Sequence, residues 1–379
     1  MTSVVTQEQR LEQLAQTNPL FGPAKLKLGT FCSNLSYGGC ISSIPGTLQL
    51  TWPNSAHLAQ LADAMKFEAV VPVARWRGFG GVTDANGESF ESMTFAAAMA
   101  ATTHYCSPFS TIHVPTLHPV MAAKQCATID HISGGRFTLN ITTGWNAQEI
   151  ALFGSPIMPH DDRYDAASEW ISLMKQLWTS EDPLDFEGRY YSVKGAHLRP
   201  HPVQPYPALM SAGASSRGQL FAAEHADIGF TSFAGRDKES MRARVNGYRQ
   251  LAWEKFGRPL TVWANANIII GDSEADAQKQ FDECLAYGDQ QALDNLFASM
   301  NITNQSFTPD MLQTLREDFI VGWNGYRIVG TKEKVVEELR YLLAVGVDGL
   351  LLTFPRFIEG MERFKEEVHP LLVQLGLRR

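Results

Sequence analysis

The chain has 379 residues, of which 44% are hydrophobic and 19% are charged, and its formal charge is −8. This composition predicts a folded protein with a large core and excludes a disordered chain. A net negative charge without a basic run argues against nucleic acid and against an anionic membrane surface as partners.

The cysteines and histidines indicate the cellular compartment of the protein and whether a metal site is expected. The five cysteines have no C-x-x-C spacing, so they indicate neither a disulfide framework nor a zinc site and favour the cytoplasm. Residues 1–18 are polar and lack the regions of a signal peptide, and no run of about 20 apolar residues predicts a membrane span. The ten histidines show no metal-site spacing, so no metal is expected.

Short apolar strands alternate with helices along the chain. The strands are predicted at 26–31, 68–73, 107–113, 137–143, 208–212, 228–231, 261–270 and 349–353. The helices are predicted at 54–67, 89–102, 118–131, 163–178, 216–225, 238–256, 274–288, 331–345 and 357–375. Residues 185–207, rich in Pro, Gly and Tyr, predict a hairpin.

Eight strands alternating with helices are typical of one α/β domain, a (β/α)8 TIM barrel with insertions that spans residues 1–379. Residues 1–24 are expected to form an N-terminal extension. Residues 289–325 lack clean periodicity and are expected to be an insertion at the active-site end that can move. A doubly wound sheet is the alternative, but no G-x-G-x-x-G follows the first strand, and R-G-F-G-G at 77–81 opens no helix.

Polar side chains gather where the predicted strands end. The fourth strand carries Asn140, Thr142 and Thr143, and the third ends with Thr111 and His113. Buried polar groups without partners cost about 1–3 kcal/mol each, so they persist where a ligand or a network satisfies them. Because barrel enzymes build their sites at the carboxyl ends of strands, these residues predict one shared site, although a lone strand Asn is usually a satisfied core amide.

The segment S-A-G-A-S-S-R-G at 211–218 combines small residues and hydroxyls at a helix start. Exposed backbone N–H groups there can cradle a phosphate, but a strand-to-helix turn with an N-cap Ser explains the same residues. Arg163 and Tyr164, at another helix start, are candidates to bind the same anion. Since no catalytic nucleophile motif or metal site is recognised, the site favours a cofactor that carries the chemistry.

Several motifs resemble those of the luciferase-like flavin monooxygenases. They are A-T-I-D-H-I-S-G-G-R-F-T-L-N-I-T-T-G-W at 127–145, D-D-R-Y at 161–164, F-E-G-R-Y-Y at 186–191, S-A-G-A-S-S-R-G, G-T-K-E-K-V-V-E-E-L at 330–339 and G-V-D-G-L-L-L-T-F at 346–354. Their order covers nearly the whole of 26–375. Within the family, R-G-F-G-G and the Asn140 strand look most like pyrimidine monooxygenases, with dimethyl sulfone and alkanesulfonate monooxygenases as the next neighbours.

The resemblance implies a bacterial-luciferase-like barrel in a two-component, oligomeric enzyme, a dimer or tetramer. A separate NAD(P)H-dependent flavin reductase would supply reduced FMN, which this chain would use with O2 to oxidise or cleave a small heterocycle, amide, sulfone or sulfonate. Val73 and Ala74 would back the flavin ring, with Asn140 and Glu149 contacting the ring or ribityl chain. The phosphate would be held by Arg163, Tyr164 and Ser215.

In the pyrimidine enzymes a Thr and an Asn shape an oxygen pocket that gives a flavin N5-oxygen adduct, and Thr111 and Asn140 stand at those positions. A hydroxyl and an amide can donate hydrogen bonds to a developing peroxide anion where water is excluded. The resemblance leaves open whether the oxygenating species is this adduct or a C4a adduct.

The sequence departs from the pyrimidine enzymes on the substrate side. Val73-Ala74 replaces a larger Met-Ile pair, the loop at 32–46 differs, and 289–325 has no counterpart, so the substrate is expected to differ from uracil. Two alternatives remain: a dehydrogenase of the same fold that uses FMN or a deazaflavin, and a non-catalytic flavin-binding protein. The T-G-W strand end and the set of site residues disfavour both.

Overall fold

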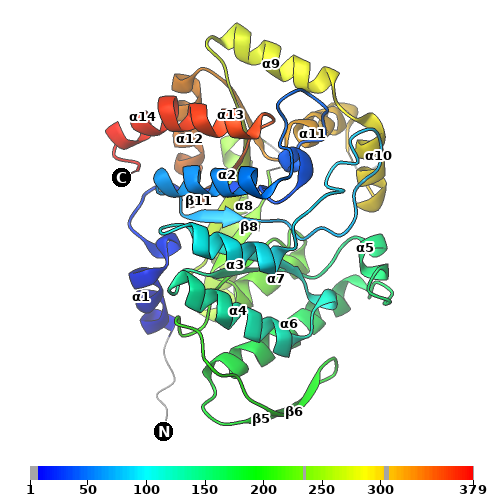
Figure 1. The fold of residues 1–379 in the computed structure, drawn as a ribbon, viewed down its shortest axis with the longest axis vertical. Coiled ribbons are helices and arrows are strands. Elements are labelled where there is room, and N and C mark those ends of the chain that lie inside the picture. Colours follow the sequence, from blue (N-terminus) through cyan, green and yellow to red (C-terminus); the bar gives the residue numbers. More distant parts are fainter. Residues whose placement is uncertain (1–6, 234–235, 303–306, 379) are drawn as a thin grey trace.

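Eight parallel strands close into a barrel in the computed structural model, which describes residues 7–233, 236–302 and 307–378 (Figure 1). In chain order they are β1 (Lys27–Phe31), β2 (Ala69–Val71), β3 (Ser107–His113), β4 (Thr138–Thr142), β7 (Ala208–Ser211), β8 (Ile228–Thr231), β9 (Thr261–Ile270) and β11 (Gly349–Thr353). The sheet closes because β11 pairs with both β1 and β9, and β9 also pairs with β8. The predicted TIM barrel is confirmed, and the doubly wound alternative is wrong.

Helices surround this barrel. Those that follow its strands are α2 (Trp52–Ala64), α3 (Ser92–Thr102), α4 (Pro119–Ser133), α6 (His160–Thr179), α7 (Ser216–His225), α8 (Lys238–Phe256), α12 (Lys332–Val345), α13 (Phe357–Arg363) and α14 (His369–Gln374), with a π-helical turn at Phe364–Val368 between the last two. Short 3-10 turns lie at Pro19–Phe21, Ser36–Gly39 and Val114–Thr116. All eight predicted strands are present, and no strand end differs by more than two residues.

Local sequence signals explain where several helices begin and end. Asp237 caps the N-terminus of α8 through the N–H of Ser240, and Gly257 ends it with φ +60°. Gly134 ends α4 in the left-handed region at φ +66°, which fits glycine because it has no Cβ to clash. The turn after α4 therefore stops the helix and directs the chain into β4.

One strand was not predicted. β10 (Tyr326–Gly330) pairs only with the distal half of β9, outside the closed barrel. β9 is long enough to serve both partners, since residues 263–267 pair with β11 and residues 266–270 with β10. The predicted hairpin is present as β5 (Leu184–Glu187) and β6 (Ser192–Ala196), which form a separate two-stranded sheet.

The range 289–325 is largely helical, although 303–306 lies outside the described residues. It contains α10 (Gln290–Ser299) and α11 (Pro309–Val321), and α9 (Glu274–Ala286) precedes it. Leu293, Leu296, Phe297 and Phe319 from this range pack with residues of the loop after β1 into one apolar cluster. Helices α10, α11 and α5 (Ala147–Ala151) lie at one end of the barrel, opposite α1 (Figure 1). The prediction that this range moves stays a prediction.

The predicted N-terminal extension contains α1 (Gln7–Thr17), a helix that was not foreseen. The Arg10 guanidinium forms a buried ion pair with Asp227, just before β8, at 2.7 Å. The Asn18 side chain donates to the Arg136 carbonyl, just before β4, at 3.1 Å. Leu20 joins the apolar cluster inside the barrel, so this segment covers the amino ends of the strands and leaves the carboxyl ends for a site.

Candidate active site

A cavity of about 990 Å³ lies at the carboxyl ends of the barrel strands. This barrel cavity receives side chains from β3, β4, β7, β8 and β9, and it is also lined by Met300, Phe319 and Trp323 from the rim. Its volume is at the upper end of that of small-molecule sites. The position agrees with the site predicted from the polar strand ends.

A short hydrogen-bond chain fixes one wall of the cavity. The Thr111 hydroxyl donates to the Pro72 carbonyl oxygen at 2.6 Å, and the Asn140 amide nitrogen donates to the Thr111 hydroxyl oxygen at 3.1 Å. The two side chains lie on paired positions of β3 and β4. Asn140 is 5% exposed, and its amide oxygen is buried with no partner among the described residues.

The direction of this chain corrects one expectation. A carbonyl can only accept, so the hydroxyl hydrogen of Thr111 is committed to Pro72 and the Asn140 nitrogen must face Thr111. The Thr111 hydroxyl is therefore not free to donate to a developing anion in this arrangement. What remains unpaired at this wall is an acceptor, the Asn140 amide oxygen.

The start of α7 forms the second wall. Ser215 caps the helix by accepting from the Gly218 N–H at 3.1 Å, and its hydroxyl oxygen also lies 3.1 Å from His160 Nε2. Gly213 and Gly218 meet closely, since a Cβ on either would lie 2.6 Å from the other's Cα. Tyr164 lies over the same place, 2.6 Å from such a Cβ on Gly218. The cavity reaches this helix N-terminus at residues 213–215, so its N–H groups can receive an anion.

Two cations near this end have only neutral partners among the described residues, whereas Arg217, in the first turn of α7, pairs with Asp165. Arg163 donates to the Gly144 carbonyl oxygen, and its Nε is buried and has no partner among those residues. Arg244, on α8, donates to the Thr231 hydroxyl at 2.6 Å. Both line the barrel cavity, as do Tyr164 and Ser215. The structure therefore brings together the three predicted phosphate ligands and adds Arg244, which the sequence patterns did not single out.

Val73 and Ala74 line the cavity after β2, as predicted for residues that back a ring. The Asn34 side chain holds them there, because it donates to the Val73 carbonyl and accepts from the Val73 N–H, both at 2.8 Å. Their small side chains leave more room than a Met-Ile pair would.

Glu149 does not line the cavity in the part of the chain that the structure describes. It is fully buried, and its carboxylate accepts from Arg75 at 3.0 Å and from the Trp76 N–H at 2.9 Å. The Arg75 guanidinium lies over the rings of Phe79, Trp145 and Trp323 at 5.2–5.3 Å. Glu149 thus holds a cation of the wall, and Arg75 rather than Glu149 faces the cavity.

Aromatic rings form part of the cavity wall. Trp145 lines the cavity, whereas Phe79 stacks behind Trp323 and Trp76 packs outside against Phe153. Trp323 was not predicted. His113 also lines the cavity, and burial together with the charge of Arg75 lowers the pKa of its imidazole to about 3. It is therefore a neutral ring at ordinary pH.

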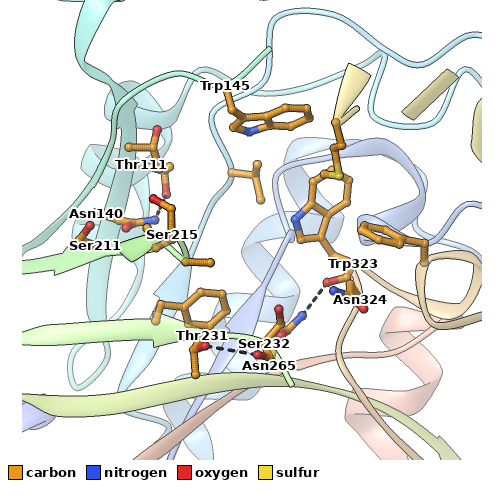
Figure 2. A pocket seen from close by; sticks show the side chains of 18 of the residues that line it. Thr111, Asn140, Trp145, Ser211, Ser215, Thr231, Ser232, Asn265, Trp323 and Asn324 are labelled. Carbon is orange, nitrogen blue, oxygen red and sulfur yellow. Dashed lines mark hydrogen bonds between the residues drawn. The ribbon is translucent and has the colours of Figure 1, made fainter. Parts of the chain in front are cut away.

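Opposite Asn140, the wall is built by β9 and the rim (Figure 2). The Asn265 amide nitrogen donates to the Trp323 carbonyl oxygen at 2.7 Å, and its amide oxygen is buried with no partner in residues 7–233, 236–302 and 307–378. Arg236 donates to both carboxylate oxygens of Asp318 at 2.7 Å. The sequence signal was the alternation A-N-A-N at 264–267, which places two amides on the same face of a strand.

The sequence profile described as luciferase-like monooxygenase matches residues 30–349. The chain belongs to this family. It is 30% identical over 360 residues to the pyrimidine monooxygenase RutA of Cronobacter turicensis, covering 92% of this chain and 94% of that protein. RutA of Klebsiella pneumoniae is 30% identical over 353 residues, covering 92% and 96%. The predicted family is confirmed, and the chain is a flavin-dependent monooxygenase.

Solved structures agree on the fold. A riboflavin lyase, RcaE, solved with modified FMN and riboflavin, has a TM-score of 0.84 at 22% identity, covering 94% of this chain and 93% of its own. DmoA from Hyphomicrobium sulfonivorans has a TM-score of 0.81 at 21% identity, covering 94% and 90%. The long-chain alkane monooxygenase LadA has 0.80 at 23%, covering 94% and 93%.

Among the described residues, no group of three or more His, Cys, Asp or Glu side chains is arranged to hold a metal ion. Within the same residues, no helix combines the length and the apolar character needed to cross a membrane.

Proposed function

We propose that this monooxygenase binds reduced FMN, delivered by a separate NAD(P)H-dependent flavin reductase, and uses O2 to oxidise or cleave a small uncharged heterocycle or amide. The observation that carries the proposal is the division of the barrel cavity into a cationic end and an amide-bearing, aromatic end. The similarity to pyrimidine monooxygenases over nearly the whole chain supports the substrate class.

The cationic end fits the phosphate of FMN. Arg163 and Arg244 carry positive charge that no carboxylate neutralises among the described residues, and the start of α7 offers N–H groups. An anion placed there gains charge-assisted hydrogen bonds, which are worth about 1.5–3 kcal/mol each. Ser215 and Tyr164 complete this phosphate site.

The Asn140 wall fits the ring of the cofactor. Reduced flavin carries ring N–H groups, and the buried oxygen of Asn140 is an acceptor that lacks a donor. Val73 and Ala74 supply a flat apolar surface beside it. The chemistry that reduced FMN supplies when bound is the two-electron activation of O2. The residues of this chain orient the ring and keep water out of the cavity.

The remaining cations argue against a sulfonate as substrate. Arg236 is paired with Asp318, and Arg75 is paired with Glu149. A sulfonate would have to displace a carboxylate from one of these pairs, at a cost in lost ion pairing. A neutral substrate meets the aromatic walls and the unpaired amide oxygen without that cost.

The proposal also covers the cellular compartment and the oligomeric state. Five cysteines are all free and buried, which supports a reducing compartment, the cytoplasm. A single domain over 1–379 and a homodimer or homotetramer are proposed from the family resemblance.

The test combines the purified chain with a flavin reductase, NADH, FMN and 18O-labelled O2, and a panel of heterocycles, amides, sulfones and sulfonates. We expect one labelled oxygen atom in the product of a neutral heterocycle or amide. If every compound survives while NADH oxidation yields only hydrogen peroxide, the proposal is wrong and the dehydrogenase or non-catalytic alternatives gain.

A further inference from the structure

We propose that Asn265 is a specificity residue that accepts a hydrogen bond from an N–H or O–H group of the organic substrate. The inference rests on the proposed function in one respect: FMN must occupy the phosphate site and the Asn140 wall, which leaves the β9 wall to the substrate. Asn265 lies on that wall, beside Trp323 and away from Thr111 and Asn140 (Figure 2).

The orientation of the Asn265 amide follows from its partner. The Trp323 carbonyl oxygen can only accept, so the amide nitrogen must face it, at 2.7 Å. The amide oxygen then has no donor among the residues that the structure describes, although the side chain is only 2% exposed. An unpaired buried carbonyl is costly, and a donor from a ligand in the cavity would satisfy it.

Asn267 shows that this strand can satisfy an amide fully. It lies two residues along β9, and its nitrogen donates to the carbonyls of Asp318 and Gly322 at 3.1 and 2.7 Å. Its oxygen accepts from the Thr353 hydroxyl at 2.6 Å. Asn267 does not line the cavity, so the chain leaves an amide oxygen open only at the position of this pair that faces the cavity.

The open oxygen sets the chemical class. Because the nitrogen is committed to Trp323, the ligand has to donate. Alkanes, sulfones and ionised sulfonates carry no N–H or O–H group, whereas lactams, imides and pyrimidine-like rings carry an N–H. The rings of Trp323, Phe230 and Phe319 line the same cavity and suit a flat substrate.

The experiment compares matched pairs of ligands on the FMN-loaded protein by isothermal titration calorimetry. The pairs are 2-pyrrolidinone with N-methyl-2-pyrrolidinone, and uracil with 1,3-dimethyluracil. We expect the N–H member of at least one pair to bind about tenfold more tightly, the effect of one hydrogen bond to a buried acceptor. Equal affinities within both pairs, or no binding of any member, would overturn the proposal.

Two variants separate the acceptor from the bond to Trp323. Asn265→Leu and Asn265→Asp both remove the amide nitrogen, but only Asn265→Asp keeps an acceptor oxygen. We expect Asn265→Asp to retain the N–H preference and Asn265→Leu to lose it, with FMN affinity unchanged in both. Identical behaviour of the two variants, or a loss of FMN affinity in Asn265→Leu, contradicts the assignment. Failure of the wild-type chain to bind FMN would instead contradict the proposed function.

Discussion

The amide oxygens of Asn140 on β4 and Asn265 on β9 are both buried, have no partner within the described part of the chain, and line opposite walls of one cavity. Each amide nitrogen is anchored, one to the Thr111 hydroxyl and the other to the Trp323 carbonyl. The cavity therefore presents two fixed acceptors. A cofactor and a substrate that each carry an N–H group would satisfy both.

Replacing Asn140 tests the wall assigned to the cofactor. We expect Asn140→Ala to bind FMN within about tenfold of the wild type, because one neutral hydrogen bond is worth about 0.5–1.5 kcal/mol. Product formation should be lost, since the ring is no longer oriented. The measurement is FMN affinity by fluorescence together with product by mass spectrometry. Thr138→Val is the control, because Thr138 lies on the same strand but away from the cavity; unchanged turnover in Asn140→Ala would refute the assignment.

The phosphate site predicts a difference between FMN and riboflavin. The double variant Arg163→Ala, Ser215→Ala should bind FMN about 10- to 100-fold more weakly, as expected for lost hydrogen bonds to a charged group. Riboflavin lacks the phosphate, so its affinity should not change. Equilibrium dialysis with both ligands measures this. An equal loss for both would mean that the variant disturbs the ring site, and no loss for either would move the phosphate elsewhere.

The barrel could be predicted from sequence because its strands and helices are marked by patterns of neighbouring residues. Each strand is a short apolar run, and each helix carries its own periodicity and caps, such as Asp237 and Gly257 at the ends of α8. β10 is short, and α10 carries a cap at Asp289 but stands in a range without a clean overall period. Their position depends on partners far away in sequence, the distal half of β9 and the apolar cluster under the rim.

The site was predictable in residue type but not in hydrogen-bond direction. Glu149 was identified from the family motif, yet its carboxylate is occupied by Arg75, 74 residues earlier. Thr111 was expected to donate to a ligand, yet Pro72 takes its hydrogen. Asn265 and Asn267 are residues of the same type on the same face of one strand. Only their hydrogen-bond partners in the folded chain distinguish the amide with an unpaired oxygen from the amide that is fully paired.

The Arg75–Glu149 pair predicts that removing one partner lowers the stability of the fold much more than removing both. Both side chains are almost fully buried and their charged atoms are 3.0 Å apart. Glu149→Leu leaves a buried guanidinium without its carboxylate and should lower the free energy of unfolding by about 3–5 kcal/mol. The double variant Arg75→Met, Glu149→Leu should recover most of this loss. Urea unfolding of the wild type, Arg75→Met, Glu149→Leu and the double variant gives the coupling energy between the two side chains. Additive losses in the free energy of unfolding would contradict a buried pair. Glu181→Gln, in an exposed pair with Arg199, is the control and should show no measurable change.

His225 predicts how stability falls with acid. Burial, and then the charges of Lys175, Arg258 and Arg217, lower the pKa of its imidazole to about 3, against an ordinary value near 6.5. Between these two pKa values, His225 is therefore protonated in the unfolded chain but neutral in the folded chain. The stabilisation is fully present above about pH 6.5 and is lost progressively as the pH falls toward 3. Between pH 7 and pH 5 the free energy of unfolding should drop by on the order of 2 kcal/mol more in the wild type than in His225→Gln. Urea unfolding at the two pH values measures this difference, and parallel losses in the two proteins would show that His225 is already protonated when folded.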